Sequence, residues 1–225
     1  MRQSEAAVVV GMGPGLGLAL ARRFARGGFS AVGIARTPDK VPAEEAIEVR
    51  QADASDAAGL DAALRSIEAD RGPITVLIYN AYRVSIGSPG IPTPSDLATD
   101  LQVNVVGAYA AVRTTHSLML PRGRGIIILT GGGLAIDPRP WPDAFSLSAG
   151  KAALRNLAYS MSEAFKADGV TVATMTITGR IQEGTPFAPD LIADAVWRLH
   201  LQGARAGPEV VFTGAGAPTS SLSLP

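Results

Sequence analysis

The sequence predicts an α/β fold, a Rossmann-like doubly wound parallel sheet of about seven strands with helices on both faces. Seven apolar runs of strand length are spread along the chain, at residues 6–10, 30–34, 46–51, 75–79, 125–130, 170–177 and 209–212. Most of them are separated by stretches with the 3.6-residue periodicity of amphipathic helices. Because parallel neighbours need long crossover connections, this alternation indicates a parallel sheet covered on both sides.

The elements alternate in order along the chain. The strand AAVVV is followed by the helical stretch LGLALARRFARGG, and the strand at 46–51 is followed by SDAAGLDAALRSIEAD. The stretch KAALRNLAYSMSEAFKADG precedes the strand at 170–177. No internal repeat or linker divides the sequence, so we expect one domain over residues 1–215. The Pro/Gly/Ser-rich residues 216–225 are expected to form a loosely held tail.

Composition excludes several classes of function. The 225 residues are 47% hydrophobic, enough for one well-buried core. Twenty basic residues balance twenty acidic ones, so no net field attracts nucleic acid or an anionic membrane. The chain has no cysteine and only two histidines, which argues against disulfides and metal sites. No apolar run approaches the roughly 20 residues of a membrane-spanning helix. We expect a soluble, cytoplasmic protein without metal, membrane or nucleic-acid partners.

A glycine-rich turn follows the first strand, in VVVGMGPGLGLALARRFA. Gly11, Gly15 and Gly17 fit the spacing G-x-x-x-G-x-G between a predicted strand and a predicted helix. In that context backbone N–H groups and the positive end of the helix dipole face a dinucleotide pyrophosphate. We therefore expect these glycines, with Leu16, to bind a dinucleotide. The alternative is a tight turn with close helix packing and no ligand.

The end of the second strand indicates which dinucleotide binds. An acidic residue about 20 residues after the glycines would hold the ribose hydroxyls of NAD(H). The segment GIARTPDK has Ala35 at that position, followed by Arg36 and Thr37. These two side chains suit a ribose 2′-phosphate, so the sequence favours NADP(H) over NAD(H). The alternative is that Arg36 is an ordinary solvated loop cation.

Further motifs, together with the glycine turn, resemble the short-chain dehydrogenase/reductase family over nearly the whole chain. They occur in the family's order: Asp53 in QADASD, Asn80 and Ala81 in IYNAY, Asn104 in LQVNVVGAY, Lys151 in SAGKAAL and Gly179 in TITGRIQEG. The resemblance implies that Asp53, Asn80, Ala81, Lys151 and Gly179 contact the cofactor. It also implies catalytic roles for Asn104, at the start of a long central helix, and for Lys151.

The resemblance implies hydride transfer between a nicotinamide and a small-molecule carbonyl or alcohol, in which a positioned acid protonates the developing alkoxide. Two positions depart from the family pattern. Leu147 stands where the family has its tyrosine acid, four residues before Lys151, and residues 131–134 (GGGL) occupy the neighbourhood of the family's serine. A third departure is the segment after Gly179, where only RIQEG precedes TPFAPDLIADAVWRLHLQ, which resembles the next helix, so the usual long lid is missing.

Several side chains are candidates to replace the missing acid. Tyr82, at the end of the fourth strand, is the strongest, although it is also explained as a wall residue with its hydroxyl in water. The weaker candidates are Ser146, Ser148, Asp137, Asp143, Trp141 and His116. Each has an ordinary explanation, as a helix cap, a solvated carboxylate or a packing group.

Two functions remain open on the sequence. One is NADPH-dependent reduction of a carbonyl, C=N or activated C=C bond without the usual tyrosine. The other is a non-redox cyclase or isomerase, or a nucleotide-binding sensor, on the same scaffold. The resemblance also implies pairing through the two long helices that contain Asn104 and Lys151, and their apolar segments NVVGAYAAV and AALRNLAYSM agree with a homodimer or homotetramer.

Overall fold

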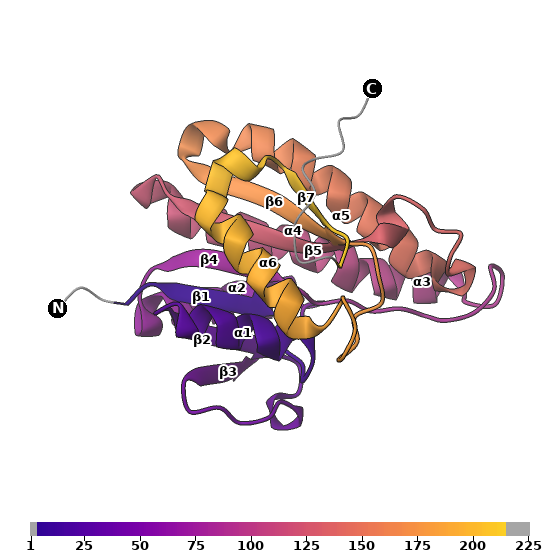
Figure 1. Ribbon diagram of the computed structural model, residues 1–225, viewed down its shortest axis with the longest axis horizontal. Coiled ribbons are helices and arrows are strands. Elements are labelled where there is room, and N and C mark those ends of the chain that lie inside the picture. The colour runs from indigo at the N-terminus through magenta and orange to yellow at the C-terminus, as the bar shows by residue number, and fades with distance from the viewer. Residues whose placement is uncertain (1–3, 215–225) are drawn as a thin grey trace.

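The chain folds into a single twisted sheet with helices on both faces. A computed structural model describes residues 4–214. The tail expected at 216–225 lies outside the described residues, as does the first part of the N-terminus. Figure 1 shows the strands running side by side, with helices in front of and behind them.

The sheet has seven strands in the order β3-β2-β1-β4-β5-β6-β7. All the ladders are parallel. Their bounds are β1 Ala6–Val10, β2 Ser30–Ala35, β3 Ile47–Gln51, β4 Ile74–Tyr79, β5 Gly125–Gly132, β6 Val170–Ile177 and β7 Glu209–Phe212. The strand order reverses direction at β1, between β2 and β4, which is where open parallel sheets bind ligands. The predicted fold class is confirmed.

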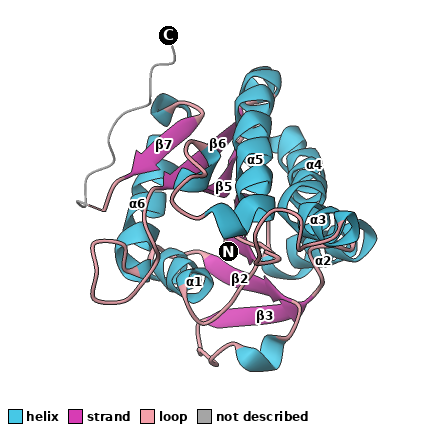
Figure 2. Cartoon of the chain, turned by 90° about the vertical axis from the view of Figure 1, so that its right-hand side faces the viewer, coloured by secondary structure: helices cyan, strands magenta, loops and turns pink. Residues whose placement is uncertain are grey.

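Residues 4–214 form six α-helices: α1 Leu16–Arg26, α2 Ala57–Arg71, α3 Pro94–Leu101, α4 Ala108–Met119, α5 Phe145–Ala164 and α6 Pro189–Gln202. Figure 2 shows α1 and α6 on one side of the strands and α2, α4 and α5 on the other. The last helix begins at Pro189, so residues 185–188, expected to start it, belong to the preceding loop. Proline at the first helical position fits this start, because its missing N–H has no partner there in any helix.

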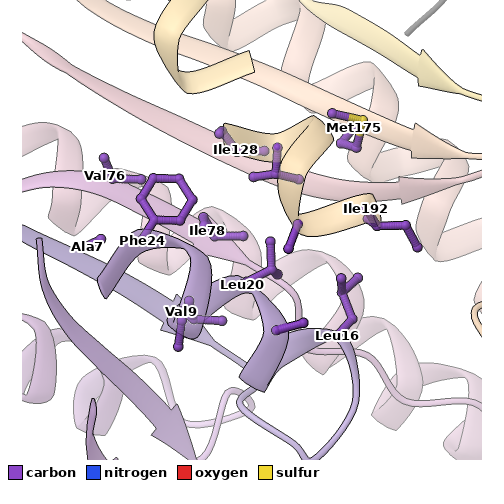
Figure 3. Close-up of a cluster of buried hydrophobic side chains, with 14 of the residues drawn as sticks. Ala7, Val9, Leu16, Leu20, Phe24, Val76, Ile78, Ile128, Met175 and Ile192 are labelled. Atoms are coloured by element: carbon purple, nitrogen blue, oxygen red, sulfur yellow. The ribbon is translucent and has the colours of Figure 1, made fainter. Parts of the chain in front are cut away.

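Each face of the sheet has its own apolar core, because side chains alternate along each strand. On one side, Leu20 and Phe24 of α1 lie against Ile78 and Ile128 in Figure 3. On the other, side chains of α2, α4 and α5 pack against the alternate positions of β1, β4 and β5. The two cores hold the strands in a fixed register, so the carboxyl ends of β1, β4, β5 and β6 meet at one edge.

The segment containing Asn104 differs from the prediction. Asn104 does not start a helix: it lies in a π-helical turn, Gln102–Gly107, between α3 and α4. The Tyr79 hydroxyl donates to Val103 O at 2.5 Å inside this turn. A side-chain hydrogen bond to a helix carbonyl competes with the regular ladder, which favours local widening.

Candidate functional site

A cleft of about 1420 Å³ opens at the carboxyl ends of the strands. It runs from the glycine turn after β1 to the start of α5. Most of the predicted site residues line it: Gly11, Gly15, Leu16, Gly17, Arg36, Asp53, Asn80, Ala81, Tyr82, Lys151 and Gly179. Thr37 and Asn104 do not line it.

The glycine turn is held against the end of β4 by close backbone contact. Gly11 has φ +87°, and a Cβ there would overlap Ala81 N. A Cβ on Gly17 would come within 2.8 Å of Gly11 O. The side chain of Asn80 completes the contact by donating to Gly11 O at 3.0 Å. Glycine at the first and third motif positions is therefore required by the fold of the turn itself.

The start of α1 is open toward the cleft. No side chain caps this helix end. A Cβ built on Gly13 or Gly15 would meet nothing within 4 Å. Uncapped N–H groups beside open space, at the positive end of a helix dipole, suit a pyrophosphate. The residues present thus fit the phosphate part of a dinucleotide.

Asp53 and Arg36 line the cleft just beyond the carboxyl ends of β3 and β2. One carboxylate oxygen of Asp53, Oδ1, accepts from Ser55 N at 2.8 Å and from Ser55 Oγ at 2.7 Å. These hydrogen bonds, helped by the nearby Arg36 guanidinium, hold the pKa of Asp53 below its usual value. Oδ2 accepts no hydrogen bond from the described residues 4–214. Arg36 is exposed, and its guanidinium donates no hydrogen bond within residues 4–214.

Lys151 lies on the floor of the cleft, on α5. Its Nζ donates to Thr130 O, at the end of β5, at 2.6 Å. Burial lowers the pKa of Lys151 to about 8, because the charged form loses hydration there. A Cβ on Gly132 would stand 3.9 Å from Lys151 Cγ, so no side chain separates β5 from the lysine at this point.

Leu147 lies one helical turn before Lys151, is 8% exposed and also lines the cleft. The two serines that flank it use their hydroxyl protons elsewhere. Ser146 Oγ donates to Asp100 Oδ2 at 2.6 Å, and Ser148 Oγ donates to Leu134 O at 2.9 Å. Both therefore act as structural groups of α5.

The loop after β4 is held by two buried side chains. Asn104 accepts from Arg83 N and donates to Arg83 O, both at 2.8 Å. The carboxylate of Asp100 is fully buried and accepts from Ser85 N at 2.6 Å and from Arg83 Nε at 2.8 Å. Asn104 thus positions the loop that carries Tyr82. Sequence reasoning missed Asp100, whose only signal is an acidic residue in the last turn of a short helix.

The rim of the cleft is apolar and exposed. Tyr82 is 63% exposed and Trp141 is 47% exposed, and Ile136 and Ile181 complete the rim. The weaker candidates of the sequence have other partners. Asp137 pairs with Arg139, Asp143 accepts from Ser88 Oγ, and His116 bonds Asp168 while stacking on Phe165.

Comparison with known proteins agrees with this geometry. Residues 5–188 match the family described as short chain dehydrogenase. The chain belongs to the short-chain dehydrogenase family. Galactitol 2-dehydrogenase from Rhizobium johnstonii is 32% identical over 189 residues, which cover 77% of this chain and 71% of that enzyme.

Solved structures of short-chain dehydrogenases superpose on most of the chain. A metagenomic short-chain oxidoreductase in complex with NADP has a TM-score of 0.79 at 26% identity and covers 92% of this chain and 96% of its own. A 3-ketoacyl-(acyl-carrier-protein) reductase from Brucella melitensis complexed with NADH has a TM-score of 0.78 at 22% identity, with coverage of 87% and 90%. The prediction of an NAD(P)-dependent oxidoreductase is confirmed at the level of the family.

The loop after β6 is short in this short-chain dehydrogenase. Between β6 and α6 the chain has only the eleven-residue loop 178–188, in which Thr178 Oγ1 donates to Phe212 O at 3.0 Å.

Among residues 4–214, no cluster of three or more His, Cys, Asp or Glu side chains is placed to hold a metal ion. In the same range no helix combines the length and the apolar character needed to cross a bilayer.

Proposed function

We propose that this short-chain dehydrogenase reduces a carbonyl, C=N or activated C=C bond of a small molecule, with NADP(H) as the hydride source. One observation carries the proposal: a single cleft connects the glycine turn at Gly11 with the buried amine of Lys151. The glycine turn at the start of α1 would hold the pyrophosphate of a dinucleotide, and the strand ends between this turn and Lys151 would hold the rest of it. When bound, the cofactor supplies a hydride to the substrate.

The preference for NADP(H) over NAD(H) rests on the end of β2. Ala35 offers no carboxylate to the ribose hydroxyls, and the exposed Arg36 guanidinium is free to pair with a 2′-phosphate. Thr37, which lies outside the cleft wall, is a secondary contact in this proposal. Asp53, Asn80, Ala81 and Gly179 complete the cofactor-binding set.

The protein's own residues have three tasks in this reaction. The glycine turn orients the cofactor, Asn104 holds the loop of Tyr82 against the cleft, and Lys151 binds polar oxygens on the cleft floor. We infer that the usual tyrosine and serine are absent, because Leu147 and Gly131–Gly133 occupy their positions. The alkoxide formed by hydride transfer then takes its proton from another donor: water, an acidic group of the substrate, Tyr82 or another group in the cleft.

Calorimetry and a turnover assay test this proposal together. We expect NADPH to bind more tightly than NADH, and its absorbance to fall when a panel of carbonyl, imine and activated alkene substrates is added. Equal or tighter binding of NADH contradicts the cofactor assignment. Failure of both dinucleotides to bind contradicts the whole proposal.

Leu147 itself favours a second candidate function. An apolar, buried side chain at the position of the acid fits a non-redox cyclase or isomerase, or a sensor that binds NADP(H) without turning it over. Tight NADPH binding with no oxidation on any member of the panel supports this alternative.

Assembly as a homodimer or homotetramer through α4 and α5 remains part of the proposal. Val106, in the π-helical turn, is 44% exposed, and Tyr109 of α4 is 50% exposed, which leaves apolar surface for a symmetric partner. Sedimentation equilibrium measures the oligomer directly, and a monomer at micromolar concentration contradicts it.

A further inference from the structure

The hydroxyl protons near the cleft floor are nearly all committed to backbone carbonyls. Thr130 Oγ1 donates to Tyr79 O at 3.1 Å, and Thr178 Oγ1 donates to Phe212 O at 3.0 Å. Ser148 Oγ donates to Leu134 O at 2.9 Å. A hydroxyl has one proton to donate, so these three groups are not free to protonate a substrate.

Lys151 is different, because an ammonium has three donors. Its Nζ donates to Thr130 O, and within residues 4–214 no second acceptor bonds it. Two residues beside Lys151 offer no polar side chain. Gly132 places no side chain between β5 and the lysine, and the side chain of Leu147 is apolar. A carbonyl oxygen that reaches the floor therefore meets the amine directly, without an intervening hydroxyl.

We propose that Lys151 is itself the general acid of this enzyme, in direct contact with the substrate oxygen. This inference rests on the proposed reductase function. As the carbonyl carbon gains a hydride, the C=O π bond breaks and its electron pair moves to oxygen. That oxygen takes one Nζ–H proton, leaving a neutral amine that regains its proton from water. In the direction of alcohol oxidation, the neutral amine takes the hydroxyl proton instead.

The surroundings of Lys151 suit it to this exchange. An ordinary lysine, with a pKa near 10.5, is a poor acid at neutral pH, whereas burial lowers the pKa of Lys151 to about 8. The charged groups on the elements packed around Lys151 form ion pairs with each other: Asp100 with Arg83, Asp137 with Arg139, and Arg155 with Glu209. Arg180 lies at the exposed rim of the cleft. The lowered pKa therefore comes from desolvation.

The sign of the pH dependence follows from this. Reduction needs the ammonium form, so kcat for reduction falls as pH rises through about 8. Oxidation needs the neutral amine, so kcat for oxidation rises through the same pH. If the proton came from water instead, kcat would not change with pH near 8.

Direct titration of the lysines tests the proposal without any turnover. The chain has three lysines, of which Lys40 and Lys166 are exposed and serve as internal controls. In protein labelled with ¹³C at lysine Cε, we expect one resonance to titrate near 8. The variant Lys151→Arg assigns that resonance by removing it. If the resonance that Lys151→Arg removes does not titrate near 8, the proposal is wrong.

Kinetics at saturating NADPH complete the test. We expect Lys151→Arg, which cannot release a proton in this range, to lower kcat by about 100-fold and to abolish the limb near pH 8. The matched control Lys166→Arg should keep the wild-type kcat and the wild-type pH dependence near 8. A limb that survives in Lys151→Arg, or that disappears in Tyr82→Phe, overturns this proposal while the reductase function stands. NADPH binding without turnover on any substrate overturns both.

Discussion

The two halves of the cleft are built on different physical principles. The half at β1 and β4 is shaped by backbone: Gly11 lies against Ala81, and Gly17 lies against Gly11. The half at β5 and α5 is shaped by single side chains, chiefly Lys151 and Leu147. We expect an exchange of one side chain on the floor to leave the turn intact, whereas a methyl added at Gly11 or Gly17 would overlap backbone atoms. We therefore expect substitutions to separate cofactor binding from chemistry in this protein.

The largest expected effect comes from Leu147→Tyr, which adds a phenol one helical turn before Lys151. The neighbouring ammonium lowers the pKa of that phenol, and a positioned acid contributes about 10²–10⁴ in rate. We expect kcat for reduction of simple ketones to rise by that order. The control Leu147→Phe has the same ring without the hydroxyl and is expected to give no gain. No increase in Leu147→Tyr, with NADPH binding intact, contradicts the separation of the two halves.

Gly11→Ala tests the backbone half. Its methyl would overlap Ala81 N, and alanine at φ +87° is itself strained, so we expect a loss of about 3 kcal/mol in the free energy of unfolding. NADPH binding should fall below detection by calorimetry. The control Gly13→Ala places its methyl in open space and should change stability by less than about 0.5 kcal/mol. Similar unfolding curves for the two variants would contradict the role of backbone contact.

Asp100→Asn probes how the substrate half is held. The buried carboxylate accepts hydrogen bonds from Ser85, Ser146 and Arg83. An asparagine there would place its NH₂ group, a donor, against one of these donors. We expect a loss of about 2 kcal/mol and faster hydrogen exchange at the Ser85 amide. The control Asp96→Asn, on the exposed first turn of the same helix, should leave hydrogen exchange at the Ser85 amide unchanged. Unchanged exchange at Ser85 would show that Asp100 does not position this loop.

The smallest effect is expected at Arg36. Removing its guanidinium in Arg36→Ala should weaken NADPH binding about tenfold, since a charge-assisted pair contributes about 1.5–3 kcal/mol before solvent screening. NADH binding should not change. Arg26→Ala, an exposed arginine at the end of α1, is the matched control. Equal weakening of NADPH and NADH would contradict a 2′-phosphate contact.

The strands, the fold class and the glycine turn could be predicted from the sequence because their signals are local. All seven predicted strands are present, and three of them, at 6–10, 170–177 and 209–212, have the predicted bounds. A run of buried apolar residues, or glycines at fixed spacing between a strand and a helix, constrains its own neighbourhood. The same holds for Leu147, whose place before Lys151 follows from counting along one helix.

The tertiary structure decided what depends on contacts between distant segments. Asn104 binds the backbone of Arg83, 21 residues away, and Ser146 binds Asp100, 46 residues away. Only the folded chain withdraws water from Lys151 and lowers its pKa, because desolvation depends on every element around the amine. The sequence by itself determined where a dinucleotide can lie. Packing determined the surroundings of the amine that we propose as the proton donor.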